Sequence, residues 1–251
     1  MENNVNKSVC FFDSGIGGLN LLSKCVGIMP RTDFTYFADN YRVPYGAMSK
    51  DELIERADQI FGEIEKLSPS AAVVACNTVT AQCIDYLRGK YSFEILGIQP
   101  AVKPAIADGG RCLVLATPAT AESASLKQLI DKLGARNITV AACDKLAAYI
   151  EKNIGNFDTK EVKAMLPRFK AESVVLGCTH YIFVKEIIKD FYNCPVYDGI
   201  DGTATNLKRI LGISDHPSSR AQKISFIGGD EAKNRRVFGM LLKQSGSLSR
   251  L

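Results

Sequence analysis

Short apolar runs alternate with amphipathic stretches along most of the chain. The runs at 9–12, 71–75 and 173–176 are rich in apolar and β-branched residues, as in strands buried on both faces of a parallel sheet. Residues 51–67 instead carry an apolar stripe at helical spacing. Because strands and helices alternate, the pattern predicts an α/β fold in which helices cover both faces of parallel sheets.

The same pattern places the expected elements. Strands are expected at 9–12, 34–39, 71–75, 94–98, 112–116, 138–141, 173–177, 195–198 and 223–227. Helices are expected after Gly18, at 51–67, 79–87, 121–133, 145–153, 159–169, 202–211 and 230–242, and from Tyr181 onward. A linker or surface loop is expected at 216–219 and a frayed tail at 245–247. Because the strand-and-turn pattern restarts near residue 112, we expect two similar halves.

Two of the expected strands end in the same way. Residues 71–78 read Ala-Ala-Val-Val-Ala-Cys-Asn-Thr, and residues 173–180 read Ser-Val-Val-Leu-Gly-Cys-Thr-His. Ligands of parallel α/β sheets bind beyond the carboxyl ends of the strands. We therefore expect the thiols of Cys76 and Cys178 to face one cleft.

Polar residues also follow the first two strands. The turn Asp13-Ser14-Gly15-Ile16-Gly17-Gly18 lets the backbone approach a ligand, but it lacks the third glycine of a dinucleotide-binding turn. Asp13 either caps the helix that follows or contributes to the site, and the spacing does not decide between the two roles. The loop at 40–46 is either a ligand wall or a well-packed turn.

Composition excludes several classes of protein. The chain has 251 residues, a net charge of +4 that is dispersed along it, and no apolar run of about 20 residues. We therefore expect neither nucleic-acid binding nor a membrane span, and a cytoplasmic location. None of the eight cysteines forms a Cys-x-x-Cys pair, so Cys10, Cys25, Cys83, Cys112, Cys143 and Cys194 are interpreted as packing residues.

Two thiols at one anion site permit several chemistries. Helix amides, with Asn77, Thr78 and Thr179, would hold a carboxylate, and the same positive field would lower the thiol pKa. A Cys–His dyad, a metal site formed by Cys76, Cys178 and His180, and a non-catalytic amino-acid-binding module are alternatives. The remaining option is acid–base chemistry, in which one thiolate removes a proton and the opposite thiol delivers another.

Four segments together resemble the motifs of bacterial glutamate racemase, within the aspartate/glutamate racemase superfamily. They are Asp13-Ser14-Gly15-Ile16-Gly17-Gly18, Pro44-Tyr45-Gly46, Ala75-Cys76-Asn77-Thr78 and Leu176-Gly177-Cys178-Thr179-His180. Their order and spacing cover nearly the whole chain. The chain departs from the family pattern at 38–41, where Ala-Asp-Asn-Tyr replaces the usual Gly-Asp-Thr, and at 143–144, where Cys-Asp replaces Cys-Pro.

The resemblance implies a cofactor-independent racemase that interconverts L- and D-glutamate and supplies D-glutamate for peptidoglycan, with no metal and as a homodimer. Aspartate or another amino acid is the alternative substrate. The resemblance also implies two doubly wound domains. They are 1–97 with 206–251 and 98–205, and the active site lies between them. Cys76 and Cys178 would be the acid/base residues, assisted by Asp13 and His180, with Glu151 in an auxiliary role. Substrate contacts are implied for Asp13, Ser14, Pro44, Tyr45, Gly46, Asn77, Thr78, Thr117, Thr120, Thr179 and His180.

Overall fold

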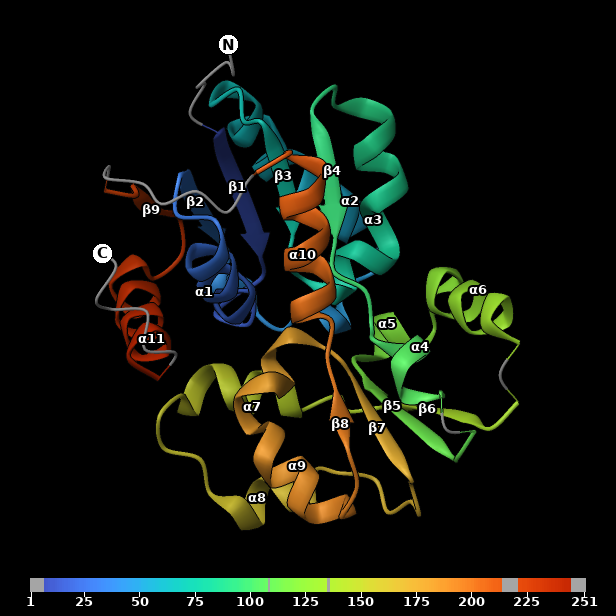
Figure 1. Cartoon of the computed structure of the whole chain (residues 1–251). Helices are drawn as coiled ribbons and strands as arrows, with labels where there is room; N and C mark the ends of the chain where they lie inside the picture. The colour runs from blue at the N-terminus through green and yellow to red at the C-terminus, as the bar shows by residue number, and fades with distance from the viewer. Residues whose placement is uncertain (1–6, 108, 135, 214–220, 245–251) are drawn as a thin grey trace.

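The first of two sheets contains strands from both ends of the chain (Figure 1). The computed structural model describes residues 7–107, 109–134, 136–213 and 221–244. In the first sheet, five parallel strands lie in the order β4-β3-β1-β2-β9. Their bounds are β1 Lys7–Asp13, β2 Thr32–Ala38, β3 Ala71–Val74, β4 Glu94–Gly97 and β9 Ile224–Ile227. The strand β9 pairs with β2, so the C-terminal segment completes the first sheet.

The second sheet has four parallel strands in the order β6-β5-β7-β8. Their bounds are β5 Cys112–Ala116, β6 Ile138–Ala142, β7 Ser173–Gly177 and β8 Val196–Tyr197. This order repeats that of β2-β1-β3-β4 in the first sheet. The expectation of two similar parallel α/β halves is therefore confirmed.

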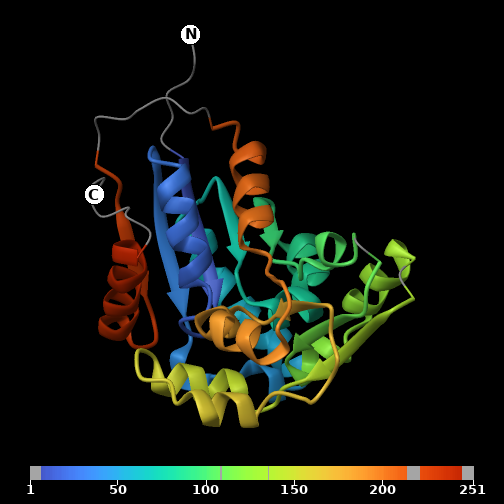
Figure 2. The same cartoon turned by 60° about the horizontal axis from the view of Figure 1, so that its bottom comes forward.

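Helices cover both faces of each sheet. On one face of the first sheet, α1 (Leu19–Ile28) packs against α10 (Ile200–Ile210) and α11 (Glu231–Gln244) (Figures 1 and 2). On the other face, α2 (Lys50–Lys66) packs against α3 (Asn77–Lys90). The second sheet is covered by α7 (Leu146–Asn153), α8 (Thr159–Ala164) and α9 (Lys185–Tyr192) on one face. Its other face carries α4 (Val102–Ala105) and α6 (Ala124–Leu133). The described helices contain no segment long and apolar enough to cross a membrane.

The structure differs from the sequence pattern at three helices. The expected helix 121–133 is divided into α5 (Pro118–Ala121) and α6, because the Ser123 side chain caps a new helix by accepting the amide of Leu126. The helix expected at 159–169 ends at Ala164, three residues before Pro167. After Cys178 the chain first forms a 3₁₀ helix over Thr179–Val184. The loop expected at 216–219 and the tail at 245–247 lie outside the described residues.

The chain crosses between the two sheets at 98–101 and at 198–199. The two crossings touch, because a Cβ atom added to Gly199 would lie 2.2 Å from the carbonyl oxygen of Gln99. Glycine at this position therefore permits backbone contact between the crossing segments.

Candidate active site

Four polar residues lie at strand ends where the two sheets approach each other. Asp13 ends β1, Cys76 follows β3, Thr117 follows β5 and Cys178 follows β7. Cys76 and Cys178 are only 5% and 6% exposed, and Cys178 is close enough that its charge raises the pKa of Cys76. The two thiols predicted to face one cleft are thus buried near each other.

Asp13 connects the glycine turn to the second half. Its carboxylate accepts hydrogen bonds from the Gly15 amide (2.8 Å) and the Thr179 hydroxyl (3.1 Å). The N-cap of α1 is Gly18, without a side-chain hydrogen bond, so Asp13 does not cap that helix. Burial raises the pKa of Asp13 to about 6, although His180, Gly15 and Thr179 each act in the opposite direction.

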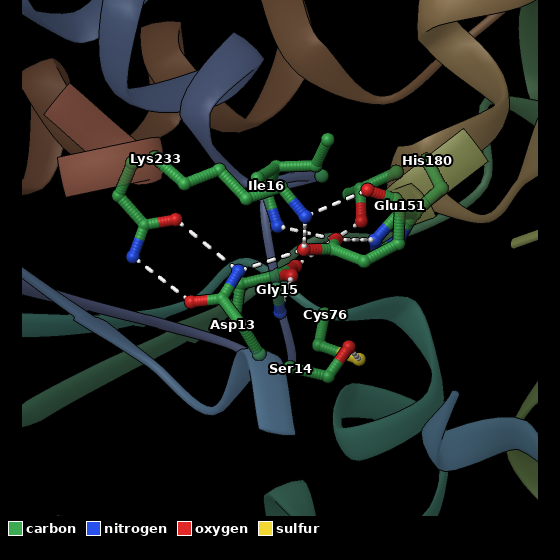
Figure 3. Close-up of polar contacts among 12 residues, drawn as sticks. Asp13, Ser14, Gly15, Ile16, Cys76, Glu151, His180 and Lys233 are labelled. Carbon is green, nitrogen blue, oxygen red and sulfur yellow. Dashed lines mark hydrogen bonds and ion pairs between the residues drawn. The ribbon is translucent and has the colours of Figure 1, made fainter. Parts of the chain in front are cut away.

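His180 and Glu151 form a buried pair (Figure 3). His180 Nε2 lies 2.8 Å from Glu151 Oε2, which also accepts the amide of Ile16 at 2.9 Å. Burial alone would lower the pKa of His180, but hydrogen bonds to Cys178 and Glu151 raise it well above its ordinary value. Burial alone would raise the pKa of Glu151, but the hydrogen bonds it accepts, above all from His180, lower it to about 2. The histidine is therefore held as an imidazolium beside Cys178.

The expected lowering of the thiol pKa is wrong for Cys76. Burial and the nearby carboxyl of Asp13 raise the pKa of this thiol to about 12, and these effects outweigh the amide of Val79 at the start of α3. The Cys76 thiol donates a long hydrogen bond to the Ser14 hydroxyl, with the heavy atoms 3.8 Å apart. Once ionised, a thiolate with so high a pKa is a strong base.

Three threonine hydroxyls form a closed triangle across the two halves. Thr78 Oγ1 lies 2.9 Å from Thr117 Oγ1, which donates to Thr120 Oγ1 at 3.0 Å, and Thr120 donates back to Thr78 at 3.3 Å. Hydroxyl hydrogens rotate to suit an acceptor, so this cluster can turn its donors toward a carboxylate. Asn77 and Thr120 also line a small cavity beside the crossing residues Gln99 and Pro100.

The loop after β2 reaches this triangle. A Cβ atom added to Gly46 would lie 2.6 Å from the Thr117 Cβ, so the loop backbone lies against Thr117. Tyr45 is fully buried and its hydroxyl donates to Asp39 at 2.6 Å. Pro44, the residue before it, follows a cis peptide bond. The loop is therefore a packed wall, with the Tyr45 hydroxyl engaged in the protein rather than pointing to a ligand.

Glycines at the first turn let the halves meet. A Cβ atom added to Gly17 would lie 2.3 Å from the Thr179 hydroxyl, and one added to Gly15 would lie 2.3 Å from Glu151 Oε2. Any larger residue at Gly17 would push Thr179 and His180 away from Asp13.

Sequence reasoning missed several residues that contact the predicted site. Arg56 of α2 binds Asp39, and Lys233 of α11 binds Glu151. Glu151 also binds Asn40, which lies in the loop at 40–46 that the sequence had singled out. The contacts of Arg56 and Lys233 join elements far apart in the chain. For Lys233, the signal in the sequence was the turn Gly228-Gly229-Asp230, which follows a strand and begins the last helix.

The remaining cysteines are free thiols. Cys10, Cys25, Cys83, Cys112 and Cys143 are buried, and Cys194 is half-buried. Among the residues that the structure describes, no group of three or more His, Cys, Asp or Glu side chains is arranged to hold a metal ion.

Known proteins are similar to this chain in sequence and in fold. The model of the family described as Asp/Glu/Hydantoin racemase matches residues 24–207. A glutamate racemase of Clostridium perfringens is 37% identical over 231 residues, which cover 87% of this chain and 88% of the relative. A glutamate racemase of Leptospira borgpetersenii is 36% identical over 218 residues, 83% of this chain and 84% of the relative.

Solved structures agree with the sequence comparisons. Escherichia coli glutamate racemase, in complex with L-glutamate and the activator UDP-MurNAc-ala, matches with a TM-score of 0.80 and 26% identity, over 94% of this chain and 95% of that chain. Glutamate racemase from Aquifex pyrophilus matches with a TM-score of 0.74 and 29% identity, over the same shares of the two chains.

Proposed function

This chain belongs to the Asp/Glu/Hydantoin racemase family, and we propose that it interconverts L- and D-glutamate by moving a proton at the α-carbon without a cofactor. The observation that carries the proposal is the pair of buried thiols, Cys76 and Cys178, at the ends of strands from two different sheets. The residues that surround them add donors for a carboxylate and a buried imidazolium.

The proton balance of this reaction is simple. The thiolate of one cysteine takes the α-proton, and the electron pair of the broken C–H bond stays on the substrate, delocalised toward its carboxylate. The thiol of the other cysteine gives a proton to the opposite face of the same carbon. The first cysteine ends as a thiol and the second as a thiolate, so turnover in the other direction restores the starting state.

The surrounding residues have complementary roles in this proposal. The imidazolium of His180 stabilises a thiolate at Cys178, while Asp13 and the glycine turn hold Thr179 in position. The hydroxyl triangle of Thr78, Thr117 and Thr120 offers donors to a substrate carboxylate. We assign Ser14, Pro44, Tyr45, Gly46 and Asn77 to the walls of the substrate site.

The test uses purified protein and L-glutamate in deuterated water without added cofactor. With the wild type we expect the optical activity to disappear and deuterium to enter the α-carbon. With Cys76→Ser or Cys178→Ser we expect neither change. Cys194→Ser, a half-buried thiol of the second half, serves as the matched control and should keep full activity. Full racemization by either site variant would contradict the two-thiol mechanism. Parallel reactions with L-aspartate and with other amino acids identify the substrate, and binding without exchange would indicate a non-catalytic binding protein.

The proposal extends to the setting of the enzyme. We propose that it acts in the cytoplasm as a homodimer and supplies D-glutamate for peptidoglycan. A strain that requires D-glutamate should grow without it when this chain is expressed, but not when Cys178→Ser is expressed. Light scattering of the purified protein measures the number of subunits.

A further inference from the structure

Glu151 divides its two carboxylate oxygens between two sets of partners. Oε2 binds His180 and the Ile16 amide, as described above. Oε1 accepts hydrogen bonds from Asn40 Nδ2 at 2.8 Å and from Lys233 Nζ at 2.7 Å (Figure 3). The carboxylate therefore joins the histidine of the candidate site to the C-terminal helix α11.

Lys233 holds Glu151 at two points. Its ammonium group donates to Oε1 and also, at 2.6 Å, to the backbone carbonyl oxygen of Glu151. The Lys233 side chain is 17% exposed and that of Glu151 is 9% exposed. Because water reaches neither group freely, this ion pair is screened far less than a surface pair. The double contact fixes both the side chain and the backbone of Glu151.

The start of α11 is itself fixed to the loop after β2. The Lys233 amide binds the Asp230 carboxylate at 2.9 Å. The next residue, Asn234, is fully buried and exchanges hydrogen bonds with Asn40 at 3.0 and 3.2 Å. The Asp230 amide also donates to Asn40, at 3.1 Å. Lys233 is thus presented to Glu151 from a rigid helix start.

The charges around Glu151 explain why a second cation matters. His180 and Lys233 are the positive groups that face it, and Asp13 is a like charge nearby. Tyr36 is close enough for Glu151 to raise its pKa. If His180 lost its proton during turnover, a buried carboxylate without Lys233 would be left with no cation. Lys233 supplies a charge that does not change with the proton transfer.

We propose that Lys233 is a positioning residue of the proton-transfer site: by holding Oε1 and the backbone of Glu151, it keeps Oε2 against His180 and so keeps the imidazolium beside Cys178. This inference rests on the proposed racemization for its effect on turnover. The effect of Lys233 on the pKa of His180 does not depend on any substrate. The role of Lys233 and the proposed racemization can therefore be contradicted by separate results.

The first test measures the pKa of His180 by NMR in the full chain without substrate. The chain has two histidines, His180 and His216, so nitrogen-15 labelling of histidine gives a simple spectrum, and His216→Gln assigns it. In the wild type we expect the pKa of His180 well above its ordinary value of about 6.5. The other groups that face His180, besides Glu151, are Cys178 and Asp13.

The direction of the change in Lys233→Met separates positioning from charge alone. Removing a positive neighbour without moving Glu151 would raise the pKa of His180, because the imidazolium would lose a repulsion. We expect a fall, because Glu151 loses its hold and no longer binds His180. Lys233→Arg, which keeps the charge and the donors, should preserve the wild-type value. A rise or no change in Lys233→Met would overturn the proposal.

Turnover gives the second readout. In Lys233→Met we expect kcat to fall roughly 10-fold, the lower end of the effect of losing a group that orients a metal-bound histidine, with a smaller change in KM. Lys233→Arg should recover most of kcat, and Lys243→Met, an exposed lysine of the same helix, should match the wild type. Thermal melting checks folding. If Lys233→Met does not fold, Lys233→Gln is measured in its place and interpreted in the same way. Equal losses in the Met and Arg variants would overturn the proposal in favour of a purely structural role.

Discussion

Asp13 and Glu151 are two buried carboxyls of the same site whose surroundings act on their pKa in opposite directions. For Asp13, burial outweighs its hydrogen bonds and raises the pKa to about 6. For Glu151, the hydrogen bonds from His180, Lys233 and Ile16 outweigh burial and lower the pKa to about 2. Folding therefore tends to protonate Asp13 and to ionise Glu151, so the two carboxyls contribute to stability over different pH ranges.

The stability of Asp13→Asn, relative to that of the wild type, should increase as the pH rises. The folded-state pKa of about 6 lies above the unfolded value of 3.8, so the contribution of Asp13 is present below 3.8 and is lost as the pH rises through 6. The loss amounts to about 3 kcal/mol at 1.36 kcal/mol per pKa unit. We therefore measure the free energy of unfolding of both proteins in urea at pH 4 and at pH 7. The value for Asp13→Asn, relative to that of the wild type, should be higher at pH 7 than at pH 4 by about that amount. An equal difference at both pH values would contradict this prediction.

Replacing Glu151 by Gln should show the opposite dependence. The folded pKa of about 2 lies below the unfolded value of 4.5, so the stabilisation is present above 4.5 and is lost as the pH falls toward 2. Glu151→Gln should therefore cost about 3 kcal/mol of unfolding free energy at pH 7 and progressively less below pH 4.5. The measurement is a series of denaturant titrations across that range. A cost that stays constant with pH would show that the ion pairs of Glu151 do not supply its stabilisation.

At the scale of elements, helix α2 fixes the loop that follows β2. The Arg56 guanidinium donates to both oxygens of the buried Asp39, at 2.7 and 3.0 Å, and Asp39 in turn accepts the hydroxyl of Tyr45. The capping box of Ser49 and Glu52 fixes where α2 begins and thereby where Arg56 points. A helix that packs through its apolar stripe thus also orders the wall of the site.

Arg56→Leu should destabilise the protein and loosen this wall. Removing Arg56 leaves the buried Asp39 carboxylate with only the longer ion pair to the exposed Arg42, at 3.6 Å. Because Arg56 is itself one quarter exposed, we expect a cost of about 2 kcal/mol. The measurements are urea unfolding and KM for the substrate, which should rise. Lys66→Ala, which removes an exposed ion pair with Glu63 on the same helix, is the control and should change stability by less than about 1 kcal/mol. Equal effects of the two variants would contradict the role of Arg56.

Sequence reasoning found what depends on local pattern. Each of the nine expected strands has a counterpart. The central strands β3, β5 and β7 are buried and apolar along their length, and the half-exposed edge strands β6, β8 and β9 were found from shorter apolar runs bounded by polar or turn-forming residues. Cys76, Cys178 and Asp13 were placed at strand ends for the same reason. The contacts of Arg56 and of Lys233 could not be predicted from the sequence. They join the surfaces of elements whose relative orientation depends on the packing of the whole molecule. The thiol pKa of Cys76 was mispredicted because burial is a tertiary property.

On the scale of the whole molecule, two crossing segments join the sheets, and the substrate site that we propose lies between the parts they connect. We propose that the chain divides into 1–97 with 206–251 and 98–205, and the packing of α10 on α1 favours including residues 200–205 in the first part as well. Because both thiols are almost fully buried, we expect that a substrate reaches them when the two parts separate. The two crossing segments meet at the contact between Gln99 and Gly199.

Gly199→Ala should disturb this contact. The added Cβ would lie 2.2 Å from a backbone oxygen, so the crossing segments must move apart, at a cost of about 1–3 kcal/mol in unfolding free energy and with reduced kcat/KM. Gly202→Ala, inside α10 with no atom within 4 Å of the added carbon, is the matched control. It should stabilise the protein by up to about 1 kcal/mol, because alanine favours a helix. Thermal and urea unfolding with racemization kinetics compare the two, and equal behaviour would argue against a special role of the contact.

The pairing of β9 with the outer edge of β2 has a consequence for how the chain is made. A ribosome releases β1 to β4 first, then the entire second sheet, and only afterwards β9 and α11. Until then the nascent first sheet has an unpaired edge at β2, and α1 lacks the cover of α11. The second sheet has all its strands within one continuous stretch and can finish folding earlier. Truncated chains that end before residue 221 therefore keep an open sheet edge and lack Lys233. We expect chaperones and proteases to bind such chains, and we expect the chains to be inactive as enzymes.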